Sequence, residues 1–456
     1  MTTYDAIVIG TGQAGPSLAR RLAAQGMSVA VIERGLFGGT CINTGCTPTK
    51  TLVASAKAAH IARRAAEFGV SIAGPVSVDM KRVKARKDVV VESSRNSVEA
   101  GVSGKNCTLY RGQARFIAPH EIRVGGSVLK SERIFINVGG RASVPPMPGL
   151  DRVEHLTNSS IMDIDFVPPH LVIVGGSYVG LEFAQMYRRF GSEVTVVEMA
   201  PRLIGREDED VSAAILDILE REGISVRLNA KCLSVAKSGG GIAATLDCAS
   251  GAPVAGGTHL LIATGRRPNT DDLGLDEAGI AHDGRGFITV DDQLRTNVPG
   301  VWALGDCNGK GAFTHTAYND FEIVAANLLD DDPRRVSERI PAYALFVDPP
   351  LGRAGLTEAE ARETGKRLLA GKRAMTQIAR AIEKGETQGF MKIVVDADTK
   401  QILGAAVLGP GGDEVIHCIL DLMYAKAPYT VMQRAMYIHP TVAEHIPTML
   451  GELRPL

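Results

Sequence analysis

The chain has 456 residues, of which 45% are hydrophobic and 22% are charged, as in ordinary globular proteins, and its length suggests about three domains. Its 50 Lys and Arg nearly balance 51 Asp and Glu, and the formal charge of −1 argues against a surface built to bind nucleic acid or an anionic membrane. No basic signal segment, no apolar run of about 18 residues and only seven cysteines are present, so we expect a cytoplasmic protein without a membrane span.

The first predicted elements form a pattern that occurs twice, near residues 4–33 and again near residues 170–198. Each copy has an apolar strand, a glycine-rich turn, a helix, a second apolar strand and a final glutamate. The glutamate follows the first glycine of the turn by 23 positions in both copies, Gly10 to Glu33 and Gly175 to Glu198. Short apolar strands that alternate with helices predict a parallel, doubly wound α/β sheet, built here twice.

The turn of the first copy reads Gly10-Thr-Gly12-Gln-Ala-Gly15. The first glycine permits a tight turn, the second lets the backbone approach a pyrophosphate, and the third allows close packing of a helix whose N-terminus carries partial positive charge. Glu33 follows at the position where a carboxylate accepts hydrogen bonds from a ribose. We therefore predict a dinucleotide site, with an ordinary glycine-rich turn as the alternative.

Two cysteines, Cys41 and Cys46, lie between the two copies, inside the segment 38–50 (GGTCINTGCTPTK). Pro48 fits the first turn of a helix that starts near Cys46, and the helix dipole together with Lys50 would stabilise a thiolate there. The alternatives are two inert thiols or half of a metal site, but the spacing and the lack of a second Cys/His pair are poor for zinc. We predict a redox-active disulfide and no metal site.

The turn of the second copy, residues 175–180 (GGSYVG), has Ser177 in place of the middle glycine, which narrows the space for a close backbone approach. Glu198 favours NADH over NADPH because a carboxylate repels a 2′-phosphate. Arg202 and Arg206 lie just beyond, either as partners for such a phosphate or as solvated residues, so NADPH stays open as the alternative.

The segment 38–50 closely matches Gly-Gly-Thr-Cys-x-Asn-x-Gly-Cys-x-Pro-x-Lys, a signature of the class I flavoprotein disulfide reductases, and the chain resembles this family along essentially its whole length. The family includes lipoamide dehydrogenase, glutathione reductase, mercuric reductase and the reactive-chlorine-resistance flavoprotein. Residues 263–269 (ATGRRPN) and 301–306 (VWALGD) are similar to two further family segments, the second of them an FAD fingerprint. Residues 137–140 (NVGG) depart from the Ala-Thr-Gly of many members.

The resemblance implies an α/β fold with two doubly wound Rossmann-like nucleotide-binding domains and a C-terminal α+β dimerisation domain. It places an FAD-binding domain at residues 1–148 and 266–335, an NAD(P)-binding domain at 149–265 and the dimerisation domain at 336–456. The implied cofactors are FAD and NADH. The predicted cofactor-binding residues are Gly10, Gly12, Gly15, Glu33, Gly39, Thr40, Gly112, Ala114, Gly139, Asp306, Ala317, Gly175, Ser177, Tyr178, Gly180, Glu198 and Gly265.

Residues 439–444 (HPTVAE) resemble the family segment whose histidine and glutamate serve the active site of the other subunit, which implies a homodimer. We expect His315 and His445, the nearest alternatives to this histidine, to be structural. The resemblance also implies that Tyr178 covers the nicotinamide pocket until the cofactor displaces it. The predicted catalytic residues are Cys41 as the thiol that attacks substrate, Cys46 as the thiolate against the flavin, His439 and Glu444 as the proton donor and its orienting carboxylate, and Lys50 with Glu182 as an ion pair near the flavin.

The predicted activity passes electrons from NADH to FAD, then to the Cys41–Cys46 disulfide, and then to a disulfide or a metal ion. The alternatives are a lipoamide dehydrogenase subunit of a 2-oxoacid dehydrogenase complex and a mercuric or copper ion reductase, with a non-catalytic redox sensor as a further one. The C-terminus lacks the cysteine pair of mercuric reductases, and Met199 and Gly205 stand where glutathione reductases have basic residues. The threonines of residues 43–50 are closer to the mercuric-reductase-like and chlorine-resistance branches than to lipoamide enzymes.

Overall fold

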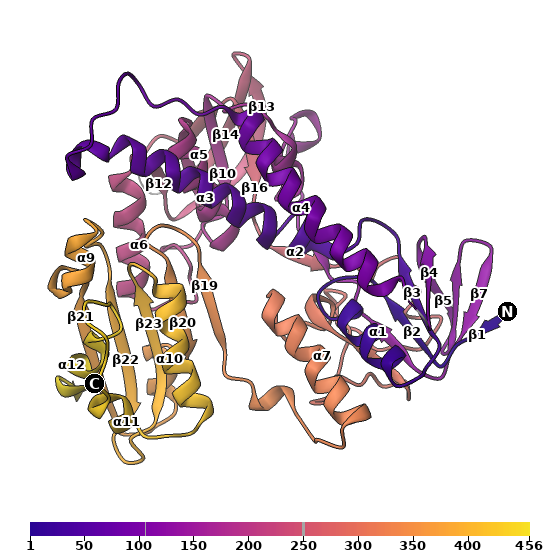
Figure 1. Cartoon of the computed structure of the whole chain (residues 1–456). Coiled ribbons are helices and arrows are strands. Elements are labelled where there is room, and N and C mark those ends of the chain that lie inside the picture. Colours follow the sequence, from indigo (N-terminus) through magenta and orange to yellow (C-terminus); the bar gives the residue numbers. More distant parts are fainter. Residues whose placement is uncertain (105, 249–250) are drawn as a thin grey trace.

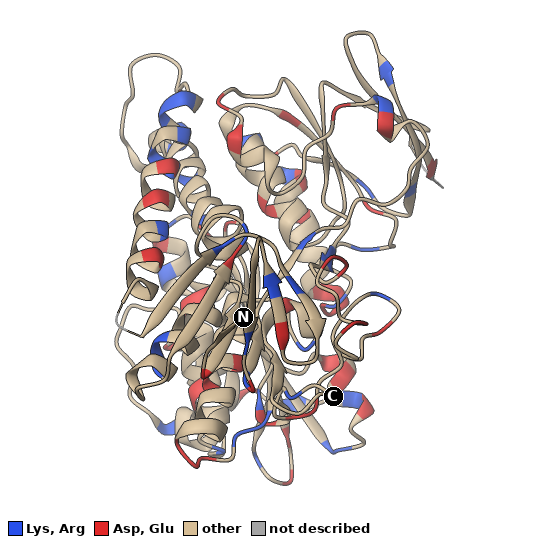
Figure 2. Ribbon diagram, turned by 90° about the vertical axis from the view of Figure 1, so that its right-hand side faces the viewer, with Lys and Arg blue, Asp and Glu red and all other residues tan. Residues whose placement is uncertain are grey.

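The computed structural model describes residues 1–104, 106–248 and 251–456. Figure 1 shows three lobes, each built on its own main sheet, with the N-terminal indigo strands in the first and the yellow C-terminal elements in the third. Figure 2 shows Lys and Arg interspersed with Asp and Glu over all parts of the fold. No helix within the described ranges is both long enough and apolar enough to cross a membrane.

The first lobe is built on five parallel strands. In spatial order they are β18 (Val301–Ala303), β8 (Ile134–Ile136), β2 (Ala6–Ile9), β3 (Val29–Glu33) and β4 (Cys107–Arg111). All four residues of β2 are buried, because this central strand is covered on both faces. Ile7 pairs with Ala30 on one side and with Ile134 on the other, so the sheet joins segments that are far apart in the sequence.

Helices cover this sheet on one side and a smaller sheet packs beside it. Helices α1 (Gly15–Ala24) and α7 (Thr314–Leu329) share the core of the sheet, and α4 (Met80–Val102) packs against α1. The smaller sheet has the order β1 (Thr2–Thr3), β7 (Ser127–Lys130), β6 (Glu121–Val124) and β5 (Ala114–Ala118). Apolar residues of both sheets, of α1 and of α7 share one buried core.

The second lobe repeats the plan of the first. Its parallel sheet has the order β12 (Ser225–Arg227), β11 (Glu193–Val197), β10 (His170–Val174) and β16 (His259–Ile262). Its helices are α5 (Tyr178–Phe190) and α6 (Glu209–Arg221), and its second sheet is antiparallel, with β13 (Ala230–Ser238), β14 (Gly241–Cys248) and β15 (Val254–Gly257). Leu171 and Ile173 face the helices while Val172 and Val174 face the antiparallel sheet, as the alternation of side chains along a strand requires.

The third lobe is a six-stranded antiparallel sheet with short helices. Its strand order is β19 (Ala342–Leu345), β20 (Leu351–Gly355), β23 (Ile402–Leu408), β22 (Phe390–Asp396), β21 (Leu368–Ala374) and β24 (Arg454–Pro455). Its helices are α8 (Glu358–Glu363), α9 (Ala379–Glu383), α10 (Gly412–Tyr424), α11 (Thr430–Arg434) and α12 (His445–Gly451). The predicted fold class, two doubly wound α/β units followed by an α+β unit, is confirmed.

Two helices carry the predicted cysteines and connect the lobes. They are the short α2 (Gly39–Asn43) and the long α3 (Cys46–Arg63), which packs between α4 of the first lobe and α5 of the second. Six short 3-10 helices complete the helices of the described residues: η1 (Ala65–Phe68), η2 (Leu150–Arg152), η3 (Ser160–Asp163), η4 (Gly305–Asn308), η5 (Val336–Glu338) and η6 (Met375–Gln377). The predicted start of a helix near Cys46 is confirmed.

The chain passes between the first two lobes through a two-stranded ladder, in which β9 (Gly140–Ala142) pairs with β17 (Arg266–Pro268). The predicted boundaries after residues 148 and 265 lie close to this ladder. The boundaries themselves, including the one after residue 335, stay predictions.

Candidate functional site

A cavity of about 950 Å³ lies where the three lobes meet, and most of the predicted site residues line it. Those that line it are Gly10, Gly12, Glu33, Gly39, Thr40, Cys41, Cys46, Lys50, Gly112, Ala114, Gly139, Tyr178, Glu182, Asp306 and Ala317. Those that the cavity lining does not include are Gly15, Gly175, Ser177, Gly180, Glu198, Gly265, His439 and Glu444. One site of the size that a dinucleotide needs therefore forms from segments that the sequence keeps far apart.

The first glycine-rich turn is pressed against the neighbouring backbone. Gly10 has φ +98°, and a Cβ there would lie 2.3 Å from the carbonyl oxygen of Asn137. A Cβ on Gly15 would lie 2.2 Å from the carbonyl oxygen of Gly10, so no larger residue fits at the start of α1. Glu33 closes the turn from the end of β3, since its Oε2 accepts hydrogen bonds from Thr11 N at 2.9 Å and Thr11 Oγ1 at 2.6 Å.

The second glycine-rich turn has the same construction. A Cβ on Gly175 would lie 2.4 Å from the carbonyl oxygen of Ala263, and one on Gly180 would lie 2.1 Å from the carbonyl oxygen of Gly175. Glu198 accepts a hydrogen bond from Gly176 N at 2.6 Å. In both copies the terminal glutamate thus holds the residue that follows the first glycine, so the sequence repeat is also a repeat of hydrogen bonds.

Asn137 is a residue whose role the sequence analysis missed. Its side chain is 5% exposed, and it accepts a hydrogen bond from Gly15 N at 3.0 Å and donates one to the Leu304 carbonyl at 2.9 Å. It therefore ties the start of α1 to the segment that precedes η4. The available signal is the departure of residues 137–140 from the family pattern.

The polar groups of the cavity suit a dinucleotide such as FAD. Asp306 lies at the cavity wall with its Oδ2 3.4 Å from Nε of Arg266, and burial raises the pKa of its carboxyl group. Gly139 lines the same wall with φ +64°, and a Cβ there would point into open space. Tight glycine turns at a helix N-terminus fit the pyrophosphate, and the Asp306 carboxylate fits hydroxyl groups of a sugar chain.

The two cysteines differ in their electrostatic environment. Cys46 is the first residue of α3, it is exposed to the cavity, and its Sγ lies 3.1 Å from Oγ1 of Thr314. Contact with the Cys41 thiol, the Thr314 hydroxyl and the charge of Lys50 lower the pKa of Cys46 to about 6, against the effect of burial. The neighbouring Cys46 sulfur and burial raise the pKa of Cys41. Both are free thiols in this structure, with Cys46 the one that ionises first.

An ion pair stands next to the cysteine helix. Lys50 Nζ lies 2.8 Å and 3.0 Å from the two carboxylate oxygens of Glu182 on α5, and Glu182 also accepts a hydrogen bond from Phe346 N at 3.0 Å. The Lys50 ammonium lies 4.4 Å from the centroid of the Phe346 ring. The predicted pair therefore forms, and it fixes a positive charge on the cavity side of α3.

Aromatic rings line the cavity beyond this ion pair. Tyr178 makes edge contacts with the rings of Phe313, at 6.0 Å between centroids, and Tyr343, at 5.5 Å. His315 stacks on Phe313 and its Nε2 lies 2.7 Å from the Ala342 carbonyl oxygen. Burial lowers the pKa of His315, so this histidine is a neutral part of the wall. Sequence reasoning did not place Phe313, His315 or Tyr343 at the cavity, because no local pattern connects them.

His439 and Glu444 form the predicted pair, but outside this cavity. Nδ1 of His439 lies 3.0 Å and 3.1 Å from the two carboxylate oxygens of Glu444. The His439 side chain is 75% exposed, while that of Glu444 is only 15% exposed. Within one chain the pair points a histidine ring to the outside rather than to Cys41. Among the described residues no three His, Cys, Asp or Glu gather as metal ligands would.

Comparisons with known proteins agree with this geometry. Residues 4–320 match the family model described as pyridine nucleotide-disulphide oxidoreductase, and residues 341–450 match the dimerisation domain of the same family. The chain is 36% identical to the probable pyridine nucleotide-disulfide oxidoreductase RclA of Escherichia coli, over 98% of both chains. A solved structure of the Cu(II) complex of the HOCl-induced flavoprotein disulfide reductase RclA from Escherichia coli superimposes with a TM-score of 0.89 at 34% identity, covering 98% of this chain and 99% of that one.

Two further relatives are named for different activities. A dihydrolipoyl dehydrogenase of Thermus scotoductus is 34% identical, with 97% of this chain and 96% of the relative covered. A mercuric reductase of Streptomyces lividans is 35% identical, with 97% of this chain and 94% of the relative covered.

Replacing Asn137 by Ala should destabilise the protein, because it leaves the buried Gly15 N–H without its acceptor, at about 1–3 kcal/mol, and leaves the Leu304 carbonyl with only the weak Cys307 thiol donor at 3.3 Å. Asn297 is the matched control, because it makes the same two kinds of hydrogen bond but is exposed. Its side chain accepts a hydrogen bond from Ala281 N and donates one to the Gly279 carbonyl, each at 2.8 Å. Chemical denaturation should show a much larger loss of unfolding free energy for Asn137→Ala than for Asn297→Ala. Equal losses would contradict the bridging role of Asn137.

The reduced protein should carry a Cys46 thiolate at neutral pH. Its pKa is lowered to about 6, so the thiolate predominates above that pH and is lost by protonation as the pH falls through it. Thr314→Val removes the hydroxyl near Sγ and should move the midpoint upward, toward the usual value near 9. The measurement is the pH dependence of the ultraviolet thiolate absorbance of reduced protein, with reduced Cys46→Ser subtracted. A wild-type midpoint near 9 would contradict this assignment.

Proposed function

The chain belongs to the pyridine nucleotide-disulphide oxidoreductase family, whose members are FAD-dependent enzymes that use NAD(P)H, and from this premise we propose that it uses NADH to reduce a small disulfide or a metal ion through Cys41 and Cys46. The observation that carries the proposal is the cysteine pair itself. Both thiols line the central cavity, and the one at the start of α3 has a strongly lowered pKa. A pair that is poised in this way is suited to thiol–disulfide exchange.

FAD, when bound along the glycine-rich turn and Asp306, supplies the chemistry that accepts a hydride and passes two electrons to a disulfide. The residues of this chain orient and charge the site around it. Lys50, held by Glu182, places a positive charge beside the cysteine helix, and the Thr314 hydroxyl, 3.1 Å from the Cys46 sulfur, can donate a hydrogen bond to the thiolate form. We assign Cys46 as the inner thiolate, since it ionises readily.

Cys41 takes the opposite role in this proposal. Its raised pKa keeps it protonated, so it needs a base before it can attack a substrate, and an acid afterwards to protonate the leaving group. His439, oriented by Glu444, has the chemistry of such a group. Because the pair lies outside the cavity of its own chain and is exposed, we assign it to the cavity of a second chain in a homodimer. The dimerisation domain at residues 341–450, which contains His439 and Glu444, supports this assignment.

The proposed nicotinamide cofactor is NADH. Glu198 lies at the end of β11 and is held by the backbone N–H groups of Gly176 and Ala200, at 2.6 Å and 2.8 Å. A carboxylate fixed in this position accepts hydrogen bonds from ribose hydroxyls and repels a 2′-phosphate. Arg202 donates a hydrogen bond to the Gly205 carbonyl at 3.1 Å and so is partly engaged within its own loop.

The acceptor divides the proposal into two candidates. A small disulfide is supported by the cysteine pair alone. A metal ion is supported in addition by two relatives, one named a mercuric reductase and one solved as a Cu(II) complex. Lipoamide remains a member of the first candidate, because a dihydrolipoyl dehydrogenase is similarly close in sequence.

The purified holoenzyme should oxidise NADH when given an acceptor, and Cys41→Ser should lose that turnover while its flavin is still reduced by NADH. Parallel assays with lipoamide, small-molecule disulfides, Cu(II) and Hg(II) assign the acceptor class by the ratio of kcat/KM values. Rapid turnover with lipoamide would identify a lipoamide dehydrogenase. Negligible turnover with every acceptor, despite rapid flavin reduction, would contradict the proposal and favour a redox sensor.

The assignment of His439 to the opposite chain predicts complementation between two inactive variants. Cys41→Ser and His439→Ala should each be nearly inactive alone, whereas mixed dimers regain one complete site. After co-refolding or co-expression in equal amounts, random pairing restores about one quarter of the wild-type sites. An active monomeric form, or mixed dimers with no activity beside fully folded parents, would contradict the shared site.

A further inference from the structure

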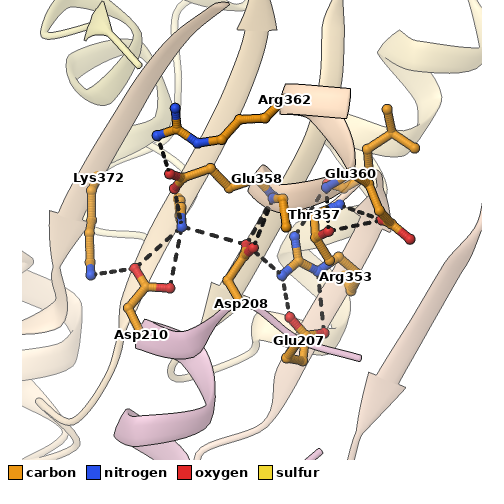
Figure 3. A network of polar contacts seen from close by, with 12 residues as sticks. Glu207, Asp208, Asp210, Arg353, Thr357, Glu358, Glu360, Arg362 and Lys372 are labelled. Carbon is orange, nitrogen blue, oxygen red and sulfur yellow. Dashed lines mark hydrogen bonds and ion pairs between the residues drawn. The ribbon is translucent and has the colours of Figure 1, made fainter. Parts of the chain in front are cut away.

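A buried ion network joins the third lobe to the second, and it lies outside the machinery assigned so far. Arg353 on β20 forms an ion pair with Glu207, which lies just before α6, and both side chains are at most 3% exposed. Lys392 on β22 reaches Asp208 at 3.5 Å and Glu358 at 2.6 Å. Figure 3 shows Arg353 and Glu207 facing each other at one end of this network. Burying such a pair costs desolvation energy. Once it is formed, its two side chains stay in one geometry, because breaking the pair would leave an unpaired buried charge.

Tyr343 connects this network to the cavity. It lies on β19, and its hydroxyl donates a hydrogen bond to Glu207 Oε1 at 2.6 Å. Its ring lines the cavity, stacks on Phe313 at 5.8 Å and meets the ring of Tyr178 edge-on at 5.5 Å. Burial and the negative charge of Glu207 raise the pKa of Tyr343, so the phenol stays protonated and keeps donating. Tyr343 is therefore an aromatic wall residue held by a charge-assisted hydrogen bond.

Tyr178 is held differently. It starts α5 in the second lobe, and its buried hydroxyl makes no hydrogen bond of standard geometry to a described residue, although the Tyr343 hydroxyl is close enough to act on its pKa. Its position in the cavity therefore depends mainly on the edge contacts of its ring with Tyr343 and Phe313. Such contacts are weak compared with a hydrogen bond to a buried carboxylate. Of the two touching tyrosines, Tyr178 is the one that can move and Tyr343 is the one that stays.

We propose that Tyr343, anchored by Glu207 and Arg353, is the stop against which Tyr178 closes over the nicotinamide side of the cavity. This inference rests on the proposed function, in which NADH enters at Tyr178. A nicotinamide ring has to draw Tyr178 away from Tyr343 before it reaches the flavin. The apparent affinity for NADH is then the intrinsic affinity multiplied by the fraction of molecules in which Tyr178 is open. Tyr343 is in this view a positioning residue that sets NADH affinity without touching the reacting atoms.

The test is Tyr343→Phe, which keeps the ring and frees it from Glu207. A loosened stop makes the closed state less stable, so the dissociation constant for NADH should fall about 2–10-fold, the range that one aromatic contact accounts for. The limiting rate of flavin reduction should stay the same, because Lys50 and Glu182 are untouched. Stopped-flow reduction of the holoenzyme flavin against NADH concentration separates these two constants. Tighter binding is a result that general structural damage does not produce.

Tyr187→Phe is the matched control, because Tyr187 is buried in α5, donates a hydrogen bond to the Ile161 carbonyl at 3.3 Å and does not line the cavity. It should leave both constants unchanged. An unchanged or weakened NADH affinity in folded Tyr343→Phe would overturn the inference.

A second measurement uses a Tyr178→Ala background, in which there is no gate to stop. There Tyr343→Phe should have no further effect on NADH affinity, whereas a purely structural role of Tyr343 would give the same change in both backgrounds. Tyr343→Leu provides the same comparison if Tyr343→Phe does not fold.

If NADH fails to reduce the wild-type flavin at all, the proposed function itself is wrong. If it reduces the wild type and the variants behave alike, the stop alone is wrong.

Discussion

One carboxylate, that of Glu182, connects the lobes beside the helix that carries Cys46. It is nearly buried on α5 of the second lobe, it binds the Lys50 ammonium of the cysteine helix, and it accepts the backbone N–H of Phe346 beside β19. Leaving this nearly buried charge unpaired would cost a large desolvation energy. The folded state is therefore favoured when α3 and the start of the third lobe supply its partners. The cavity, the cysteine pair and the aromatic wall all form around this junction.

The same junction explains why two chemically identical thiols behave differently. Cys46 lies at the N-terminus of α3, near Lys50 and Thr314, and its ionised form is stabilised there. Cys41 sits on the preceding short helix, next to a sulfur that is already charged, and its own ionisation is opposed. In the proposed mechanism this asymmetry creates the need for an external base, and the proposal assigns that role to the histidine that faces outward from the third lobe. The proposal thus links the acid–base chemistry to oligomerisation.

Most of the fold and of the candidate site was open to prediction because it depends on local patterns. The repeated strand, glycine turn and glutamate predicted the two parallel sheets, because tight turns and fully buried strands restrict which residues fit. The segment from Gly38 to Lys50 predicted the cysteine pair and the start of α3 in the same way. The family relation is confirmed over the length of the chain, whereas the roles of individual site residues and the domain boundaries stay predictions.

What the sequence by itself determined is the set of turns, helix starts and buried strands, each encoded within a few residues of its own position. Only the tertiary structure decided that Asn137 clasps two distant segments, that Thr314 reaches the Cys46 sulfur, and that Tyr343 stands between a buried ion pair and Tyr178. These contacts join residues more than 100 positions apart, and no spacing rule relates them. They arise because buried polar groups must find partners when the lobes pack, and packing alone determines which partners are within reach.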